Sequence, residues 1–326
     1  MATMRDQAVR GDGMTNKEYR KNAWPNGPFH QSQIADYCAC PFKFYMKYVL
    51  GMEPETIGTK MFFGTVMHKA IADLHATEKI PHLAETIKRC ETEENRPVFW
   101  EDKKVEIEKF IDDAIPTLTN YWNKPFNRDA EILLAEAEFE VDIGKFKFGG
   151  RIDQLRRYQD ETILIDFKTG AAQTNEHLIE IDYQLSIYAY SIDYGRFVGN
   201  KGWNLDKVAI YRTQDHLPYK KKTTKKSTGE VFMAGDERGP GLYTTTRHPK
   251  DFEAMIQDLS TICRNIVGPH FDDKVGHLVK GGAFGRTPNI MSCQMCGLKA
   301  ECLAARKQAI IDTTNITIDE EDIINV

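Results

Sequence analysis

The chain has 326 residues, of which 41% are apolar and 28% are charged, a balance typical of a globular protein that buries a substantial core. No run of about 18 apolar residues appears, so no membrane span is expected, and the opening residues, MATMRDQAVRGDG, lack the apolar stretch of a secretory signal. A net charge of −5 is unlike that of a protein that simply coats DNA, but it neither supports nor excludes a nucleic-acid substrate.

The first part of the chain predicts a polar arm followed by helices. Residues 1–28 are polar and contain several glycines and prolines, which indicates a mobile or loosely docked arm. Ser32 is an N-cap signal for a helix that ends near Gly51, and Pro41 should kink that helix or split it in two. Apolar spacing and charge pattern then predict two further helices, over 63–78 and about 101–124.

The middle of the chain predicts strands. Residues 131–143, 146–157 and 161–168 have the composition of three antiparallel strands, the last two joined by a tight turn near Gln159-Asp160. The remaining segments are a helix at about 182–195, a strand at 207–213, a basic loop or hairpin at 214–249, a helix at about 250–267 and an acidic tail. The expected fold is therefore α/β, with a central mixed sheet flanked by helices.

The segments GGRIDQL and ILIDFKTG carry a candidate site. Asp153 and Asp166 lie on adjacent strands of a predicted hairpin, and an in-register pairing can bring their side chains together. Lys168 is two residues beyond Asp166 and therefore points to the same face, whereas Ile165 and Phe167 point into a core. Neighbouring carboxylates repel unless a cation joins them, and their oxygen atoms suit Mg²⁺ or Mn²⁺. An exposed hairpin decorated with charge is the alternative, because Asp-x-Lys alone is a weak signal.

Other side chains can complete this site. His68, on the helix over 63–78, can offer a third metal ligand, although a lone helical histidine is more often a packing or surface residue. Gln184 and Tyr188 are four apart and share a helix face, from which they could orient the lysine or contact DNA. An ordinary amphipathic helix would show the same spacing. Glu138 and Glu140, on the preceding strand, are candidates for supporting a second metal or Lys168.

Cysteine spacing near the C-terminus indicates a second metal site. Cys293, Cys296 and Cys302 form a C-x2-C-x5-C pattern, and a tetrahedral thiolate site needs a fourth ligand. Cys40 is the expected fourth ligand and Cys38 the reserve. Four cysteines can bind Zn²⁺ or an iron–sulfur cluster, and the spacing alone does not distinguish the two. Reduced core cysteines are the alternative.

These motifs together resemble the PD-(D/E)-x-K nuclease superfamily in its RecB-type branch. More narrowly, they look like the iron–sulfur nucleases of that branch, which include the CRISPR-associated four-cysteine exonucleases, the AddB nuclease domain and the nuclease domain of the flap-trimming nuclease–helicase. The matching motifs occur in family order across residues 30–305: CPFKF (40–44), GTVMH (64–68), GRID (150–153), IDFKTG (165–170), QLSIY (184–188) and the cysteine triplet. Ile165 stands where the family pattern has proline, and residues 214–249 match nothing in the family.

The resemblance implies roles for the motif residues. It implies that His68, Asp153, Asp166 and the carbonyl of Phe167 hold the metal and that Lys168 is the catalytic lysine. Gln184 and Tyr188 match the branch's Gln-x3-Tyr motif, and Cys40, Cys293, Cys296 and Cys302 match the ligands of a [4Fe–4S] cluster. The implied fold is restriction-endonuclease-like, with a helical lobe clasped by the four cysteines.

The resemblance also implies an activity and an organisation. The expected activity is Mg²⁺- or Mn²⁺-dependent hydrolysis of DNA, most simply as an exonuclease on single-stranded ends. An endonuclease within a recombination, repair or CRISPR-adaptation complex with a protein partner, and a degenerate DNA-binding module, are the alternatives. A cytoplasmic location in a bacterial or phage-infected cell is expected. The expected organisation is an arm (1–28), one nuclease domain (29–312) and an acidic tail (313–326). Within the domain we expect, in order, a helical lobe (29–130), a catalytic sheet core (131–213), a basic insertion (214–249) and a C-terminal helix with the cysteines (250–312).

Overall fold

The computed structural model describes residues 27–170, 176–197, 203–225, 229–267, 271–272, 277–278, 287, 293–294 and 296–304. The chain divides into two compact units, Met1–Gln31 with Glu55–Ile266 and Ser32–Pro54 with Val267–Val326. Most of the predicted N-terminal arm and all of the predicted acidic tail lie outside the described residues.

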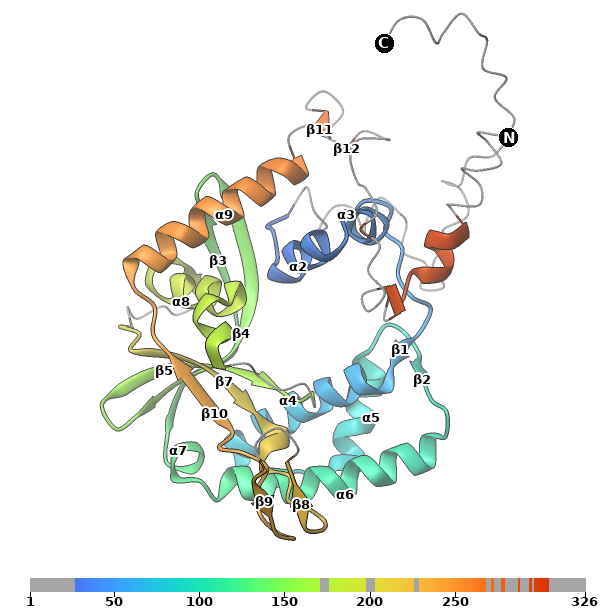
Figure 1. Cartoon of the computed structure of the whole chain (residues 1–326), viewed down its shortest axis with the longest axis vertical. Coiled ribbons are helices and arrows are strands. Elements are labelled where there is room, and N and C mark those ends of the chain that lie inside the picture. The colour runs from blue at the N-terminus through green and yellow to red at the C-terminus, as the bar shows by residue number, and fades with distance from the viewer. Residues whose placement is uncertain are drawn as a thin grey trace, which may run out of the picture. The chain divides into compact units, whose positions relative to one another are not determined.

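A six-stranded mixed sheet forms the centre of the first unit (Figure 1), with strand order β10-β7-β5-β4-β3-β6. Strand β5 runs parallel to β7, and every other pair in the sheet is antiparallel. The strands are β3 (Glu131–Ile143), β4 (Phe146–Tyr158), β5 (Glu161–Lys168), β6 (Arg196–Phe197), β7 (Lys207–Arg212) and β10 (Leu242–Thr245). The predicted central mixed sheet and the three-stranded meander are confirmed.

The turn between β4 and β5 sets the register of the candidate site. Tyr158 pairs with Glu161, so only Gln159 and Asp160 form the turn, as predicted. Gln159 adopts φ 55°, in the left-handed region that tight hairpin turns require. The register that follows pairs Gln154 with Ile165.

Helices cover both faces of this sheet (Figure 1), with α4, α5 and α6 on one side and α8 and α9 on the other. Their bounds are α4 (Thr59–Thr77), α5 (Leu83–Glu93), α6 (Lys103–Trp122), α7 (Pro125–Arg128), α8 (Tyr183–Tyr194) and α9 (Pro249–Val267). The four long helices predicted in this unit are present, whereas α5 and the short parallel pair β1 (Ile57–Gly58) and β2 (Val98–Phe99) were not predicted. In the described residues, no helix is both long and apolar enough to span a bilayer.

The core lies between β5, β7 and the helices α4 and α6. Ile165 and Phe167 of β5 are buried against Leu74 of α4 and against Leu118 and Tyr121 of α6. Because side chains alternate along a strand, the intervening Asp166 is directed to the opposite face, where it contacts α8. This confirms the predicted orientation of the strand.

The segment 214–249 is more ordered than the predicted loop or hairpin. It contains the hairpin of β8 (Thr223–Thr224) and β9 (Val231–Phe232), as expected, and it begins within the short helical turn η3 (Thr213–His216). It also supplies β10, which pairs with β7 at the edge of the main sheet. The prediction was wrong on that point because four residues, LYTT, are too short for a clear alternation.

A buried polar network joins α6 to the sheet. Arg156 of β4 is fully buried and donates to the hydroxyl of Tyr121 (3.1 Å) and to Oδ1 of Asn127 (2.9 Å). The Tyr121 hydroxyl lies 2.7 Å from Nε2 of His75 on α4. Burial, with the nearby charge of Arg156, lowers the pKa of His75 to about 4, so this imidazole is neutral at pH 7.

The second unit contains the helix predicted from Ser32, divided at Pro41 as expected. Its described parts are α2 (Gln31–Ala39), α3 (Pro41–Phe44) and the π-helical turn η1 (Tyr45–Val49). Asp36 fixes these pieces together, because its carboxylate accepts hydrogen bonds from Lys43 (2.6 Å), Lys47 (2.9 Å) and Tyr48 (3.0 Å).

The neutral state of His75 predicts a pH dependence of stability. Between pH 7 and pH 5 the unfolded chain takes up a proton at this residue while the folded chain does not, so stability falls as the pH falls. The substitution His75→Gln keeps a hydrogen-bonding group and removes the titration. Urea unfolding at both pH values should show that wild type loses about 1 to 2 kcal/mol more than the variant does. An equal loss in both proteins would contradict a buried neutral imidazole.

Candidate active site

Asp153 and Asp166 are neighbours across β4 and β5, as the hairpin register predicted. Gln154 pairs with Ile165, which places the two aspartates at the next step of the ladder. Oδ2 of Asp153 accepts a hydrogen bond from the backbone N–H of Phe167 at 2.7 Å. This bond ties the Asp153 carboxylate to the end of β5 and leaves Oδ1 to face His68.

Lys168 forms a compact hydrogen-bonded group with Asp166 and α8. Its Nζ lies 2.6 Å from Oδ2 of Asp166 and donates to Oε1 of Gln184 at 3.0 Å. The Nε2 group of Gln184 donates to Oδ1 of Asp166 at 2.9 Å and to the Tyr188 hydroxyl at 3.0 Å. Gln184 therefore contacts both members of the Asp-x-Lys pair, which is the orienting contact that its spacing suggested.

Burial dominates the electrostatics of this group. Asp166 is 3% exposed, and burial raises the pKa of its carboxyl to about 6, with the charge of Lys168 opposing that rise and the charge of Asp153 adding to it. Burial acts to lower the pKa of Lys168, but the Asp166 carboxylate outweighs it and the net shift is upward. Burial also raises the pKa of Tyr188 to about 12. Lys168 and Tyr188 are therefore protonated at neutral pH. The buried Asp166 carboxylate is stabilised by positive charge beside it.

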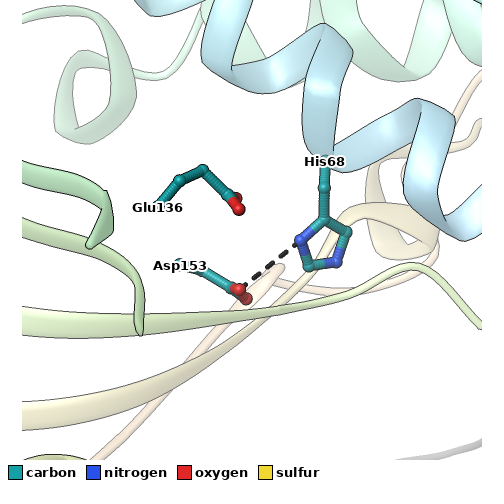
Figure 2. A group of neighbouring side chains, drawn as sticks. All are labelled: His68, Glu136 and Asp153. Atoms are coloured by element: carbon teal, nitrogen blue, oxygen red, sulfur yellow. Dashed lines mark ion pairs between the residues drawn. The ribbon is translucent and has the colours of Figure 1, made fainter. Parts of the chain in front are cut away.

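A second group of side chains lies beside the first (Figure 2). The ligand atoms of His68, Glu136 and Asp153 all lie within 4.8 Å of one another, and Nδ1 of His68 is 3.5 Å from Oδ1 of Asp153. The three residues come from α4, β3 and β4. Burial acts to lower the pKa of His68, but the hydrogen bond and the charge of Asp153 outweigh it and raise that pKa. His68 thus lies against Asp153, although only the family motif suggested that its helix would lie beside the sheet.

Glu136 is the member of this group that sequence reasoning missed. The pairs Ala135–Gln154 and Ala137–Ile152 place it opposite Asp153. Its backbone has φ 50°, a left-handed conformation that is uncommon for a residue other than glycine. Glu138 and Glu140, which sequence reasoning selected instead, are exposed and lie outside the group. The regular alternation of β3 gave no reason to prefer one of these glutamates over another.

The donor atoms of the His68 group suit a divalent cation. Two carboxylates and one imidazole provide oxygen and nitrogen ligands with excess negative charge, and such sets bind ions of the Mn²⁺ type. Asp166 lies outside this group, with its two oxygens paired to Gln184 and Lys168.

The four cysteines expected to share a cluster lie in the second compact unit. Ser32–Pro54, which carries Cys40, belongs to the same unit as the C-terminal segment that carries Cys293, Cys296 and Cys302. All four are free thiols, and among the described residues they do not converge closely enough to hold a single ion. The N–H of Cys296 donates to the carbonyl of Cys293 (3.3 Å), and the N–H of Cys302 to that of Leu298 (3.0 Å).

Comparisons with known proteins bear on this site. A search of curated proteins finds no match. Among solved structures, a protein from Eubacterium rectale that carries the provisional name of exonuclease has a TM-score of 0.42 at 10% identity, covering 89% of this chain and 98% of its own. A second, named SSO0001, has a TM-score of 0.26 at 14% identity, covering 83% of this chain and 94% of its own. At scores this low, neither likeness carries an argument about activity.

The match to a family model is extensive. The model of the PD-(D/E)XK nuclease superfamily matches residues 28–303, a range that includes every residue of the two groups described above. Nucleases of this superfamily use divalent metal ions, which agrees with the donor atoms that the site offers. The chain is therefore a member of the PD-(D/E)XK nuclease superfamily.

Proposed function

We propose that the protein hydrolyses DNA phosphodiester bonds with Mg²⁺ or Mn²⁺ and acts as an exonuclease on single-stranded ends. The observation that carries the proposal is the Lys168 ammonium, held between Asp166 and Gln184 next to the His68–Asp153 pair. The preference for single-stranded ends rests on the motifs that resemble the iron–sulfur nucleases of the RecB-type branch.

The proposed metal ligands are His68, Asp153, Asp166 and the carbonyl of Phe167. A divalent ion bound there would supply Lewis-acid stabilisation of the phosphate and lower the pKa of a water molecule. The Phe167 N–H fixes the orientation of the Asp153 carboxylate, so that its free oxygen faces His68. Preorganised ligands of this kind reduce the reorganisation needed when substrate binds.

Lys168 is the proposed source of positive charge for the reacting phosphate. Its side chain is 43% exposed, so the ammonium can reach a bound phosphate while its stem stays anchored beside Asp166. The raised pKa keeps the amine protonated at neutral pH, which favours stabilisation of negative charge over general-base action. Gln184 is a positioning residue, because it holds Lys168 and Asp166 in one arrangement.

We also propose that Cys40, Cys293, Cys296 and Cys302 bind a [4Fe–4S] cluster, with Zn²⁺ as the alternative. The two segments that carry these cysteines are far apart in the sequence but belong to one compact unit, which agrees with a shared cluster, although no three of the described cysteine sulfurs lie within 4.8 Å of one another. Within that unit, a Cβ at Gly297 would lie 2.7 Å from Cγ of Pro54, so the turn after Cys296 lies directly against the N-terminal segment. The proposed role of the cluster is to stabilise the fold, because metal binding at such sites contributes folding energy.

The central test is DNA cleavage by site variants. Asp166→Asn and Lys168→Ala should each lower the cleavage rate of a linear, end-labelled single strand at least about 100-fold, because the first weakens a proposed metal ligand and the second removes the positive charge that stabilises the reacting phosphate. Circular single-stranded DNA should stay intact. Cleavage of the circle by wild type would indicate an endonuclease, and full activity in Asp166→Asn would sink the catalytic assignment.

A second test concerns Gln184. The substitution Gln184→Leu removes the hydrogen bonds to Lys168 and Asp166 and should lower kcat about 10- to 100-fold, as loss of a supporting partner commonly does. KM should change little. Tyr183→Phe is the matched control, since it alters the preceding residue of α8 at a surface hydrogen bond to Asp258. A Gln184→Leu variant as active as this control would contradict the positioning role.

A third test concerns the cysteines. Protein purified without oxygen should be brown and absorb at about 400 nm, as thiolate-bound iron–sulfur clusters do. Cys40→Ser should remove the colour and lower the melting temperature, while the neighbouring substitution Cys38→Ser should leave both unchanged. A colourless wild-type protein that contains stoichiometric zinc would overturn the cluster in favour of Zn²⁺.

A further inference from the structure

The environment of Glu136 separates it from the other glutamates of β3. Its side chain is 34% exposed, and its carboxylate faces His68 and Asp153 (Figure 2), which are 27% and 15% exposed. These three side chains reach one point from α4, β3 and β4. A convergence of an imidazole and two carboxylates from three elements is typical of a coordination site and is costly without a cation, because the carboxylates repel each other.

The partner that Glu136 has in the structure does not satisfy the whole group. Nε of Arg151 lies 3.0 Å from Oε2 of Glu136. The Arg151 side chain is 61% exposed, so this ion pair forms at the solvent side and is worth little free energy. A carboxylate can use its second oxygen for an ion while the first stays paired, or it can exchange the exposed arginine for the ion.

The backbone of β3 also distinguishes this position. The register of β3 against β4 shifts between Ile132 and Leu134, and Glu136 follows with φ 50°. A left-handed backbone is unfavourable for a residue with a Cβ. The pairs Ala135–Gln154 and Ala137–Ile152 keep one register on either side of Glu136, so the left-handed backbone is local to the residue that faces the site.

We propose that Glu136 is a ligand of the divalent ion together with His68 and Asp153, and that Arg151 is its exchangeable partner. The inference rests on the proposed metal-dependent function and adds a ligand that the sequence motifs do not contain. With Glu136 added to the proposed ligands, one imidazole nitrogen stands among oxygen donors, a set that suits Mn²⁺ better than Mg²⁺, which strongly prefers oxygen ligands. The site is therefore expected to select Mn²⁺ when both ions are present.

Binding of Mn²⁺ in the absence of DNA tests the assignment directly. The free Mn²⁺ signal in electron paramagnetic resonance, measured at pH 8 with the full-length protein, gives the affinity without any assay of cleavage. Glu136→Gln should weaken Mn²⁺ binding at least about 10-fold, because ligand charge strongly tunes the affinity of such sites. Glu136→Asp, which keeps the charge and shortens its reach, should give an intermediate loss.

Two matched variants separate coordination from charge and from folding. Glu138→Gln removes the same charge from an exposed position two residues along β3 and should change the affinity by less than about threefold, since exposed charges are screened. Arg151→Ala removes the competing cation and should leave Mn²⁺ binding as tight as in wild type or tighter. Circular dichroism without metal should show native folding in each variant.

The outcomes are distinguishable. Equal affinities for Glu136→Gln and Glu138→Gln would overturn the assignment, as would an Arg151→Ala variant that binds Mn²⁺ as weakly as Glu136→Gln does. Either result would mean that Glu136 only forms a surface ion pair with Arg151 and does not bind the metal ion. A wild-type protein that binds no Mn²⁺ at any concentration tested would instead remove the proposed metal-dependent function, whatever the variants do.

Discussion

The buried carboxylate of Asp166 is the constraint around which the site is arranged. A carboxyl group that is 3% exposed cannot carry its charge without nearby positive charge and hydrogen-bond donors. Lys168 provides the charge from the same strand face, and Gln184 provides a donor from α8. Asp166, Lys168 and Gln184 each contact the other two. Removing any one of them therefore leaves the other two without a hydrogen-bond or charge partner. These contacts therefore fix the position of Lys168 at the end of β5, beside the buried carboxylate.

Much of the fold and the centre of the site could be predicted from the sequence because the relevant signals are local. The composition of residues 146–157 and 161–168 indicated β4 and β5, and the short turn at Gln159-Asp160 fixed their register. That register made Asp153 and Asp166 neighbours. A spacing of two put Asp166 and Lys168 on one face of β5. A spacing of four put Gln184 and Tyr188 on one face of the helix α8. Each inference needed only the regular geometry of one strand, one helix or one hairpin.

The rest depended on contacts that no local pattern contains. His68 lies 3.5 Å from Asp153 only because α4 crosses the sheet at that point, and its role could be suggested only from a family motif. Glu136 reaches the same point through an irregular residue of β3, and regular alternation cannot predict such an irregularity. The cysteines pose the same problem over a longer range. In the sequence, Cys40 is separated from the other three cysteines by all the strands of the sheet. Cysteine spacing could therefore suggest it as the fourth ligand but could not show that it lies near the other three.

The edge strand β10, which lies in the segment 214–249, covers the outer side of β7. Strand β7 is paired with β5 on one side, and its other side would expose backbone N–H and C=O groups if β10 did not pair with it. Open strand edges recruit strands from other chains and promote aggregation. β10 closes that edge with only four residues, two of them threonines at its end, which leaves little template for a further strand. The segment 214–249 thus shortens the part of the sheet edge that is open to pairing with another chain.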